Sequence, residues 1–270
     1  MNGILVVNAY LKGEKFEVLY SHIKKAAKKA GVILEKRNNE EMQFFDGEAD
    51  FVLFWDKDVN LAKRLENKGI PVFNSSQAIA LCDDKAKTYL TLEGIVPQPL
   101  TYIAPLSYSE TDYTGFVNAA TEKLGFPVVF KECFGSFGEQ VYLCNSVSDV
   151  LSHVNEKPFL LQQYIEGGNE DVRLEIVGDK CVAAMTRKNK NDFRSNITNG
   201  ATAEEYTPTQ SEIELAVKAC RALRLDFGGV DILNHSLICE VNSNAHIINL
   251  LSITGKDAAK DIFDYIIKKL

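Results

Sequence analysis

Short apolar runs alternate with amphipathic stretches over the first 77 residues. The runs are only a few residues long, and the stretches between them repeat their apolar positions at helical spacing. Strands are expected at Ile4–Val7, Val32–Lys36, Phe51–Phe54 and Val72–Asn74, and helices at Phe16–Ala30 and Leu61–Lys68. Because strands that alternate with helices form parallel sheets, residues 1–77 are expected to fold as an α/β unit around such a sheet.

The pattern of apolar and polar residues changes after Ser75, and antiparallel strands are expected in the second half of the chain. Two helices come first, and Pro97 and Pro99 then break the chain before a strand, a helix and a strand that ends at Lys131. The helices expected from Ser75 onward are Ser75–Leu81, Asp84–Glu93, Ser211–Leu223 and Asp257–Lys269. The later strands are Phe159–Tyr164, Val172–Val177, Cys181–Thr186, Val230–Leu233 and Leu237–Val241, of which the last two predict a hairpin.

Composition and charge narrow the class of protein. The 270 residues are 46% hydrophobic and 25% charged, as in ordinary folded proteins. The net charge of −7 has the wrong sign for a protein held mainly by nucleic-acid phosphates. Apolar runs such as Ile247–Leu251 fall far short of the roughly 20 residues that a membrane span needs, and the first residues show no signal-peptide pattern. We therefore expect a cytoplasmic globular protein without a nucleic-acid or membrane partner.

Several common ligand motifs are missing from the sequence. The six cysteines form no CxxC pair and the four histidines form no HExxH, so a zinc site is not expected and any metal should be bound by oxygen. No GxGxxG or GxxxxGK[ST] occurs in the first 77 residues. The WDKD segment Trp55–Asp58 follows the third expected strand, where open parallel sheets bind ligands. A solvent-exposed loop explains this segment equally well.

A first candidate site is the segment FPVVFKECFGSFGEQVYL, which begins at Phe126. Lys131 ends a strand here, and the loop containing Gly135, Ser136 and Gly138 precedes a returning strand. Glycines let backbone N–H groups approach phosphate oxygens closely, and a lysine on a strand supplies a fixed positive charge. A hairpin with a salt-bridged lysine is the structural alternative.

A second candidate site is the hairpin that carries GVDIL and CEVN. Asp231 lies on one strand, and Glu240 and Asn242 lie two residues apart on the other, where they share a face. Three hard oxygen ligands on neighbouring strands are suited to Mg²⁺ beside nucleotide phosphates. Solvated carboxylates at strand ends are the alternative.

Arginines form the third candidate feature, because they are scarce relative to lysine in this chain and yet cluster. Asp171 and Arg173 stand two apart, and Arg187 precedes the run that contains Arg194. The rigid guanidinium fork suits carboxylate or phosphate oxygens, although surface salt bridges would use it too. The three features together are much less expected by chance than any one of them.

In order, the motifs CDDK, DVR, AAMTRKNKNDFRSN, GVDIL and CEVN make the chain similar to the ATP-grasp superfamily. It most resembles the RimK-like ATP-dependent carboxylate–amine ligases, of the alpha-L-glutamate ligase type. The resemblance implies an α/β ATP-grasp fold with an N-terminal parallel-sheet domain and two α+β grasp subdomains. The implied divisions are a pre-ATP-grasp domain at residues 1–77, a small subdomain with the glycine loop at 78–157, and a C-terminal subdomain with the metal site at 158–270.

The resemblance also implies roles for particular residues. Arg187 and Arg194 match catalytic arginines, and Asp231, Glu240 and Asn242 match the Mg²⁺ ligands. Gln163 and Tyr164 match the segment that meets adenine. The full nucleotide-binding set carried over from the family is Lys85, Lys131, Gly135, Ser136, Gly138, Gln163, Tyr164, Asp171, Arg194, Ser195 and Asn196.

Two departures from the family pattern concern specificity. Where the family continues its metal strand with a small residue, proline and glycine, this chain has Ser243, Asn244, Ala245 and His246. After the arginine motif it has Asn199-Gly200-Ala201 in place of paired glycines. Both departures are expected near the acceptor pocket, so they concern substrate specificity. The nucleotide and metal residues of the family pattern are all present.

The activity implied by the resemblance is amide or peptide bond formation through an acylphosphate, with ATP and Mg²⁺ (or Mn²⁺) as cofactors and ADP and phosphate as products. The amine is glutamate or another amino acid, and the carboxylate belongs to a small molecule, a peptide or a protein tail. The sequence is also compatible with a homo-oligomer. An ATP-grasp phosphotransferase and a non-catalytic nucleotide-binding regulator are the alternatives.

Overall fold

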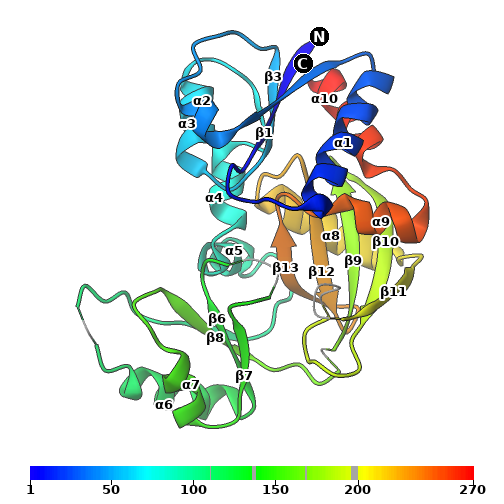
Figure 1. Ribbon diagram of the computed structural model, residues 1–270. Helices are drawn as coiled ribbons and strands as arrows, with labels where there is room; N and C mark the ends of the chain where they lie inside the picture. Colours follow the sequence, from blue (N-terminus) through cyan, green and yellow to red (C-terminus); the bar gives the residue numbers. More distant parts are fainter. Residues whose placement is uncertain (110, 136–137, 168, 196–199) are drawn as a thin grey trace.

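The computed structural model describes residues 1–109, 111–135, 138–167, 169–195 and 200–270, and these form three sheets flanked by helices (Figure 1). The N-terminal sheet is parallel throughout, with the order β2-β1-β3-β4. Its strands are β1 (Asn2–Val7), β2 (Ile33–Asn38), β3 (Phe51–Trp55) and β4 (Val72–Phe73).

Helices cover both faces of this sheet. This is required because the central strands are apolar at successive positions, and successive side chains point to opposite faces. Leu5 and Leu53 face one layer, which contains α1 (Glu14–Lys29) and the C-terminal α10 (Ala258–Lys269). The residues next to them in sequence face the opposite layer, which contains α2 (Asn39–Gln43) and α3 (Val59–Asn67). The last helix of the chain therefore completes the first sheet, and both termini lie at the same end of the molecule (Figure 1).

The expected strands and helices of the first 77 residues are present, with ends that differ by at most two residues. Helix α2 was not expected, because five residues give no periodicity to recognise. Its start does carry a local signal. The Asn38 side chain accepts from the backbone of Glu41 while the Glu41 carboxylate accepts from the backbone of Asn38, which is a capping box.

The small sheet is antiparallel, with the order β5-β8-β6-β7, and α6 (Thr114–Leu124) and α7 (Val147–His153) pack on one face. Its strands are β5 (Thr101–Ile103), β6 (Val128–Glu132), β7 (Val141–Cys144) and β8 (Phe159–Gln163). The rings of Phe130 and Phe159 stack at 4.9 Å in its core. Since β8 belongs to the small sheet, this sheet extends past the domain boundary that was expected between residues 157 and 158. The division into three domains stays a prediction.

The large sheet is also antiparallel, with the order β11-β10-β9-β12-β13. Its strands are β9 (Glu170–Val177), β10 (Lys180–Lys188), β11 (Thr202–Glu205), β12 (Phe227–Leu233) and β13 (Leu237–Asn242). Helix α8 (Gln210–Ala222) covers one face. Strand β11 and helix α9 (Ile247–Thr254) were not expected, since β11 has no apolar alternation and the run Ile247–Leu251 was considered only as a membrane segment.

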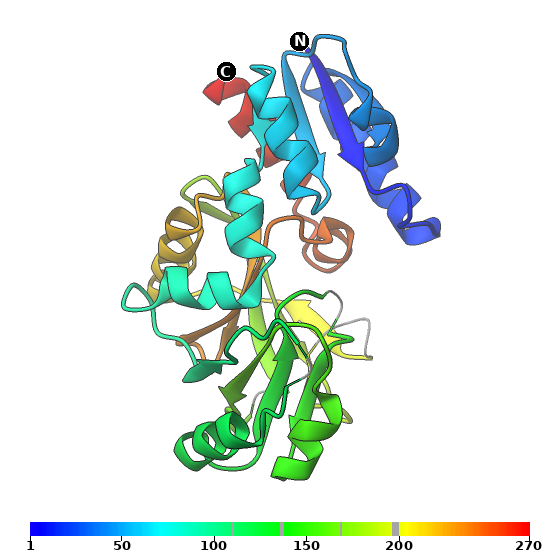
Figure 2. The same cartoon turned by 90° about the vertical axis from the view of Figure 1, so that its left-hand side faces the viewer.

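Helices α4 (Ser76–Cys82) and α5 (Lys85–Leu92) lie between the N-terminal sheet and the rest of the molecule. Figure 2 shows the N-terminal sheet and the small sheet at opposite ends, with the large sheet between them. No helix in the described ranges is long and apolar enough to cross a membrane.

The buried side chain of Asn74 connects the N-terminal sheet to the large sheet. Its amide nitrogen donates to the carbonyl oxygens of Phe227 and Ser243 at 2.9 and 2.8 Å. Its carbonyl oxygen accepts from the backbone of Asp226 and Phe227. Trp55 stacks on Phe227 beside it, with ring centroids 5.7 Å apart. The two sheets therefore share one hydrophobic and hydrogen-bonded junction.

Candidate active site

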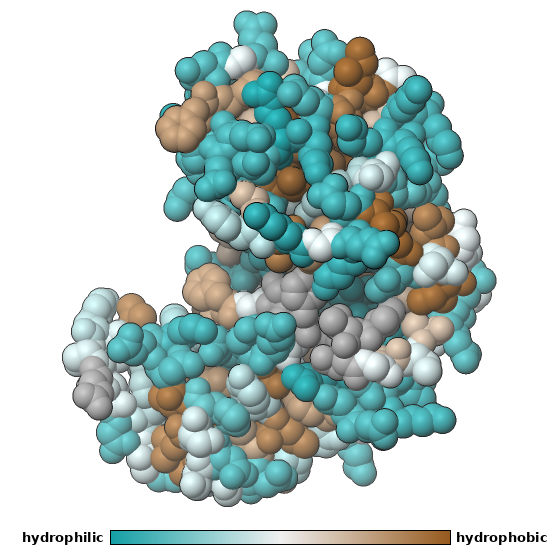
Figure 3. Space-filling view, viewed as in Figure 1, coloured by the Kyte–Doolittle hydropathy of each residue, from teal (hydrophilic) through white to brown (hydrophobic). Residues whose placement is uncertain are grey.

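A pocket opens between the small and large sheets and collects most of the residues expected to act. Figure 3 shows the surface hollowed where the lobe of α6 and α7 meets the rest of the molecule. Asn242 lines two adjoining pockets instead. Ser136 and Asn196 lie outside the described residues. The predicted residues that line this pocket are Lys85, Lys131, Gly135, Gly138, Gln163, Tyr164, Asp171, Arg187, Arg194, Ser195, Asp231 and Glu240.

The period-2 alternation of β9 explains why charges gather on one face of the large sheet. Val172, Leu174 and Ile176 point into the core against α8, so the intervening Asp171 and Arg173 point to the opposite face. Cross-strand register then places Arg187 opposite Asp171, and Asp231 opposite both Arg173 and Glu240. The neighbouring strands therefore present a continuous charged surface.

The charged residues of this face are held by buried ion pairs. Arg173 donates from Nε and Nη2 to the two oxygens of Asp231, at 2.6 and 2.7 Å. Arg187 donates from Nε to Asp171 at 2.7 Å, and its Nη2 lies 3.0 Å from Asp231. Burial raises the pKa of Asp231, but the two arginines outweigh burial and lower it below its ordinary value. Asp231 is therefore a carboxylate, and both arginines have fixed orientations.

Asp171 is also constrained by the segment that follows β10. The Ser195 hydroxyl donates to Asp171. Burial raises the pKa of Asp171, and Arg187 and Ser195 offset that effect only in part. The sequence comparison with the family predicted a nucleotide contact for Asp171. In the structure its carboxylate also orients Arg187.

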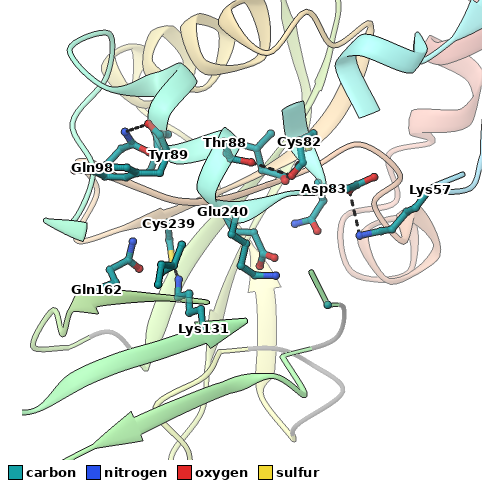
Figure 4. A pocket seen from close by; sticks show the side chains of 16 residues that line it. Lys57, Cys82, Asp83, Thr88, Tyr89, Gln98, Lys131, Gln162, Cys239 and Glu240 are labelled. Carbon is teal, nitrogen blue, oxygen red and sulfur yellow. Dashed lines mark hydrogen bonds and ion pairs between the residues drawn. The ribbon is translucent and has the colours of Figure 1, made fainter. Parts of the chain in front are cut away.

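Two lysines face the pocket from different elements. Lys131, at 8% exposure, points from β6 toward Cys239 and Glu240 on β13 (Figure 4), with its Nζ 3.9 Å from the Cys239 sulfur. Lys85 begins α5, and burial and nearby Lys131 lower its pKa although Glu240 opposes them. In the described part of the chain, neither ammonium lies within 4.0 Å of a carboxylate oxygen. The alternative of a salt-bridged lysine at position 131 therefore does not describe this site.

Arg194 connects the glycine loop to the segment after β10. Its Nη1 donates to the carbonyl oxygen of Gly138 at 2.7 Å, and Asp192 accepts from its Nε and Nη2. The Asn189 side chain organises the turn by accepting from Asn191 and Asp192 and donating to the Arg194 carbonyl. This local folding brings together two motifs that are 56 residues apart.

The donor set of the β12–β13 hairpin fits a hard divalent cation. Asp231 and Glu240 face one another in register, and Asn242 follows two residues later on the face of Glu240. Two carboxylates and an amide oxygen are ligands that Mg²⁺ accepts. Asp231 is already satisfied by two arginines, so a cation there would share this carboxylate with Arg173 and Arg187.

Sequence reasoning did not assign roles to several residues that line these pockets. Lys57 reaches Asp83 at 3.1 Å, as Figure 4 shows. Asp83 also accepts from the Ser243 hydroxyl. The WDKD segment was noted without being placed at a site, and CDDK was used only for its lysine. The apolar lining of the pocket between the sheets is Val129, Val141, Ile165, Phe193 and Leu233. Apolar residues of this kind look like ordinary core in a sequence.

Two antiparallel sheets that face one another across lysines, arginines and carboxylates, beside a parallel α/β unit, define the ATP-grasp class of enzymes. The sequence model of the RimK-like ATP-grasp domain matches residues 82–266, which is more than half of the chain. The chain therefore belongs to the RimK-like ATP-grasp family of carboxylate–amine ligases. It is an ATP-dependent, ADP-forming enzyme.

Individual relatives agree with this assignment. An uncharacterized protein of Mycoplasma pneumoniae is 35% identical over 223 residues, which cover 77% of each chain. A probable alpha-L-glutamate ligase 2 of Hahella chejuensis is 34% identical over 218 residues, or 76% of this chain and 69% of the relative. The crystal structure of a RimK domain ATP-grasp protein from Sphaerobacter thermophilus has a TM-score of 0.76 at 20% identity, over 98% of this chain and 99% of that chain. The last comparison shows the shared fold.

Proposed function

We propose that this protein joins a carboxylate to an amine through an acylphosphate. In the first step a carboxylate oxygen of the substrate attacks the γ-phosphorus of ATP, and the bond from that phosphorus to ADP breaks. In the second step the amine nitrogen attacks the carbonyl carbon, loses a proton and expels phosphate. Both steps need alignment and charge neutralisation rather than a side-chain nucleophile.

The observation that supports this proposal best is the pair Lys85 and Lys131. Glu240 lies near both ammonium groups but forms an ion pair with neither among the described residues. A half-buried or buried ammonium that makes no ion pair is unfavourable unless a ligand supplies further negative charge. A polyphosphate does so, and the apolar residues that line the pocket suit a purine base. Lys85, Lys131, Gly135 and Gly138 would hold the phosphates, and Gln163 and Tyr164 would meet the base.

The arginines and the hairpin complete the proposed site. Arg187 and Arg194 would stabilise the charge on the moving phosphoryl group, with Arg187 held in place by Asp171. Asp231, Glu240 and Asn242 would hold Mg²⁺, or Mn²⁺ in its place. When bound, the ion would neutralise phosphate charge. Ser195 would support the same region through Asp171.

For the substrates, we propose an amino acid as the amine, with glutamate as the first to test. The name of the Hahella chejuensis relative supports glutamate. The carboxylate would belong to a small molecule, a peptide or a protein tail. A cavity of about 820 Å³ beside the pocket, lined by residues of the N-terminal and large sheets, has room for each of the first two.

Trapping the acylphosphate tests the reaction type. The protein is incubated with ATP, Mg²⁺, hydroxylamine and a pool of amino acids and short peptides. Hydroxamate and nucleotide products are then measured. We expect hydroxamate and ADP to form in equal amounts, because hydroxylamine takes the place of the amine. Replacing hydroxylamine by glutamate should give an amide with the same stoichiometry.

The products separate this proposal from its rivals. AMP as the nucleotide product would indicate adenylation. ADP with a phosphoester and no hydroxamate would indicate a phosphotransferase. Binding of ATP without any product would indicate a regulatory protein. Each of these three results would refute the ligase mechanism.

A further inference from the structure

The cavity of about 820 Å³ adjoins the pocket drawn in Figure 4, where α5 meets β13. Three residues line both spaces, namely Lys57, Glu240 and Asn242. Glu240 and Asn242 are two of the proposed metal ligands, so the boundary between the two spaces lies at the reacting end of the proposed nucleotide site. Lys57 supplies the positive charge at this boundary.

The fold brings Lys57 to the boundary from the N-terminal sheet. In the order β2-β1-β3-β4 the chain passes from β1 to one side for β2 and then to the other side for β3. Ligands of open parallel sheets bind at such a switch point, beyond the carboxyl ends of the strands. Lys57 lies two residues after β3, which ends at Trp55. It therefore stands where this sheet would contact a ligand.

An ion pair fixes the position of the Lys57 side chain. Its Nζ lies 3.1 Å from Oδ1 of Asp83, as Figure 4 shows. Asp83 is itself held in place, because it accepts from the Ser243 hydroxyl at 3.1 Å. Burial raises the pKa of Asp83, and the nearby Lys57 ammonium opposes that shift. Asp83 therefore orients Lys57 in the way that Asp171 orients Arg187.

The ammonium of Lys57 can still bind a ligand. An ammonium has three N–H donors, and among the described residues Asp83 is its one carboxylate partner. The side chain of Lys57 is 37% exposed, so a ligand can reach it. Burial lowers the pKa of Lys85, and the charges of Lys131 and Lys57 lower it further. Lys57 is therefore accessible and also lies within electrostatic reach of the proposed phosphate site.

The arginines that line the cavity are less available than Lys57. Arg173 donates two N–H groups to Asp231, at 2.6 and 2.7 Å. Arg187 donates to Asp171 and lies 3.0 Å from Asp231. The side chains of Arg173 and Arg187 are 14% and 4% exposed. A ligand in the cavity therefore meets the Lys57 ammonium more readily than either guanidinium group.

The proposed reaction needs a cation at this boundary. The substrate carboxylate and the γ-phosphate of ATP are both negative, so their approach is unfavourable unless positive charges lie around them. Lys85 and Lys131 line the nucleotide side of the boundary, and Lys57 lines the side of the cavity. The three lysines therefore surround the place where the two anions would meet.

We propose that Lys57 binds the carboxylate of the substrate that is to be activated, through an N–H donor that Asp83 does not use. The ion pair with Asp83 positions the ammonium, and the rest of the acid occupies the cavity. This inference rests on the ligase mechanism proposed above. It deepens that mechanism by naming a residue of the N-terminal sheet that binds the acid.

Kinetics of Lys57→Met test this role. The hydroxamate assay with ATP and Mg²⁺ uses the amino acid or dipeptide that gives wild-type protein the highest yield. We expect Lys57→Met to raise the KM for this acid by about 10- to 100-fold, the range of one charge-assisted hydrogen bond. ATP affinity, measured by isothermal titration calorimetry, should remain that of the wild type, because Lys57 does not line the described part of the pocket that contains Gln163 and Tyr164.

A double variant separates substrate binding from a purely structural ion pair. Lys57→Met alone leaves Asp83 buried without its cation, and such a charge can disturb a site indirectly. Combining Lys57→Met with Asp83→Asn removes the unpaired carboxylate as well. If Lys57 binds the acid, the double variant keeps the raised KM, because the ammonium is still missing. If the ion pair has only a structural role, the double variant recovers the KM of the wild type.

Lys63→Met is the matched control. Lys63 lies on the nearby α3 and pairs with Glu66 at 3.3 Å. It is not among the described residues that line the cavity or the pocket of Figure 4. This variant should keep the wild-type KM for the acid and the wild-type ATP affinity. Circular dichroism reports whether each variant folds, and if Lys57→Met does not fold, the double variant is compared with the wild type.

Three results would overturn the inference while the wild-type hydroxamate leaves the ligase mechanism standing. One is an unchanged KM for the acid in folded Lys57→Met. Another is recovery of the wild-type KM in the double variant. The third is a loss of ATP affinity in the folded double variant, which would assign Lys57 to the nucleotide. If wild-type protein binds ATP but no acid gives hydroxamate, the ligase proposal and this inference fail together.

Discussion

At the scale of single residues, the site depends on charges that are buried and held by their neighbours. Arg173 and Arg187 lie against Asp171 and Asp231, where the desolvation of each charge is offset by its partners. Buried ion pairs of this kind add little net stability, but breaking one leaves an uncompensated charge. The ion pairs instead hold the guanidinium groups of the two arginines in a fixed orientation.

Lys131 differs because its ammonium forms no ion pair with any residue that the structure describes, and its replacement tests the nucleotide site directly. Lys131→Ala should weaken ATP binding by about 1.5–3 kcal/mol, the size of a hydrogen bond to a charged group. Isothermal titration calorimetry measures this loss. Lys157→Ala is the control, since Lys157 pairs with Glu132 from a more exposed position near the same strand. Equal ATP affinity in wild-type and folded Lys131→Ala protein would remove Lys131 from the site.

Glu175 gives a prediction on pH and stability. Burial raises the pKa of this carboxyl to about 7, although Arg173 opposes the shift. The folded state therefore binds a proton more tightly than the unfolded state, so wild-type stability falls as pH rises from about 4.5 to about 7. Glu175→Gln does not titrate, and its stability relative to wild type should increase over the same window by about 3 kcal/mol.

Urea unfolding at pH 4.5 and pH 7.5 measures that change. Fluorescence of Trp55, the single tryptophan of the chain, can follow unfolding because its ring stacks on Phe227. A stability difference between Glu175→Gln and wild type that does not vary with pH would contradict the raised pKa. The comparison between two pH values removes the constant cost of burying an amide.

At the scale of elements, the β12–β13 hairpin determines which acidic residues can meet a cation. Its register places Asp231 opposite Glu240, and an irregularity follows between Asp231 and Ile232. Both residues seemed equivalent as metal ligands in the sequence. The structure distinguishes them, because Asp231 also neutralises two arginines and its replacement would leave those arginines without a partner.

Glu240→Gln is therefore the cleaner test of the proposed metal site. We expect it to lower Mg²⁺-dependent turnover by at least about 100-fold, because a neutral amide replaces a charged oxygen ligand of nearly the same volume. Circular dichroism should show the wild-type fold. Glu214→Gln, on the exposed side of α8, should keep full activity. Wild-type Mg²⁺ dependence in Glu240→Gln would place the ion elsewhere.

At the scale of the whole molecule, the N-terminal sheet is positioned by a small junction that contains Asn74. Its side chain makes four hydrogen bonds to backbone groups more than 150 residues away. Through this junction, the carboxyl ends of β1 and β3 face the charged side of the large sheet. The cavity between them exists only because both halves are held in this relation.

Asn74→Ala should destabilise the protein by about 3–5 kcal/mol, because buried donors and acceptors of the backbone would lose their partners. Urea unfolding followed by Trp55 fluorescence measures this change. Asn118→Ala, at an exposed position of α6, should have little effect on stability. A loss below 1 kcal/mol in Asn74→Ala would show that the junction does not depend on this side chain.

Much of this arrangement follows from local patterns that a sequence displays. Alternation of apolar runs and helical stretches predicted the parallel sheet, and period-2 spacing predicted that Glu240 and Asn242 share a face. The motif order predicted the family, which the comparisons confirm. Short elements such as α2 and β11 were missed because four or five residues carry too little periodicity.

What the sequence determined by itself is the class of fold and the kinds of residue available for chemistry, because strand and helix periodicities and short motifs are local properties of the chain. Only the tertiary structure decided which charges meet. The pairing of Arg173 with Asp231 depends on strand order in the large sheet. The hydrogen bonds of the Asn74 side chain depend on the packing of the N-terminal sheet against the large sheet. These contacts join residues that are far apart in the chain. The free energy of each contact depends on how deeply the residues are buried, which no local sequence pattern reports.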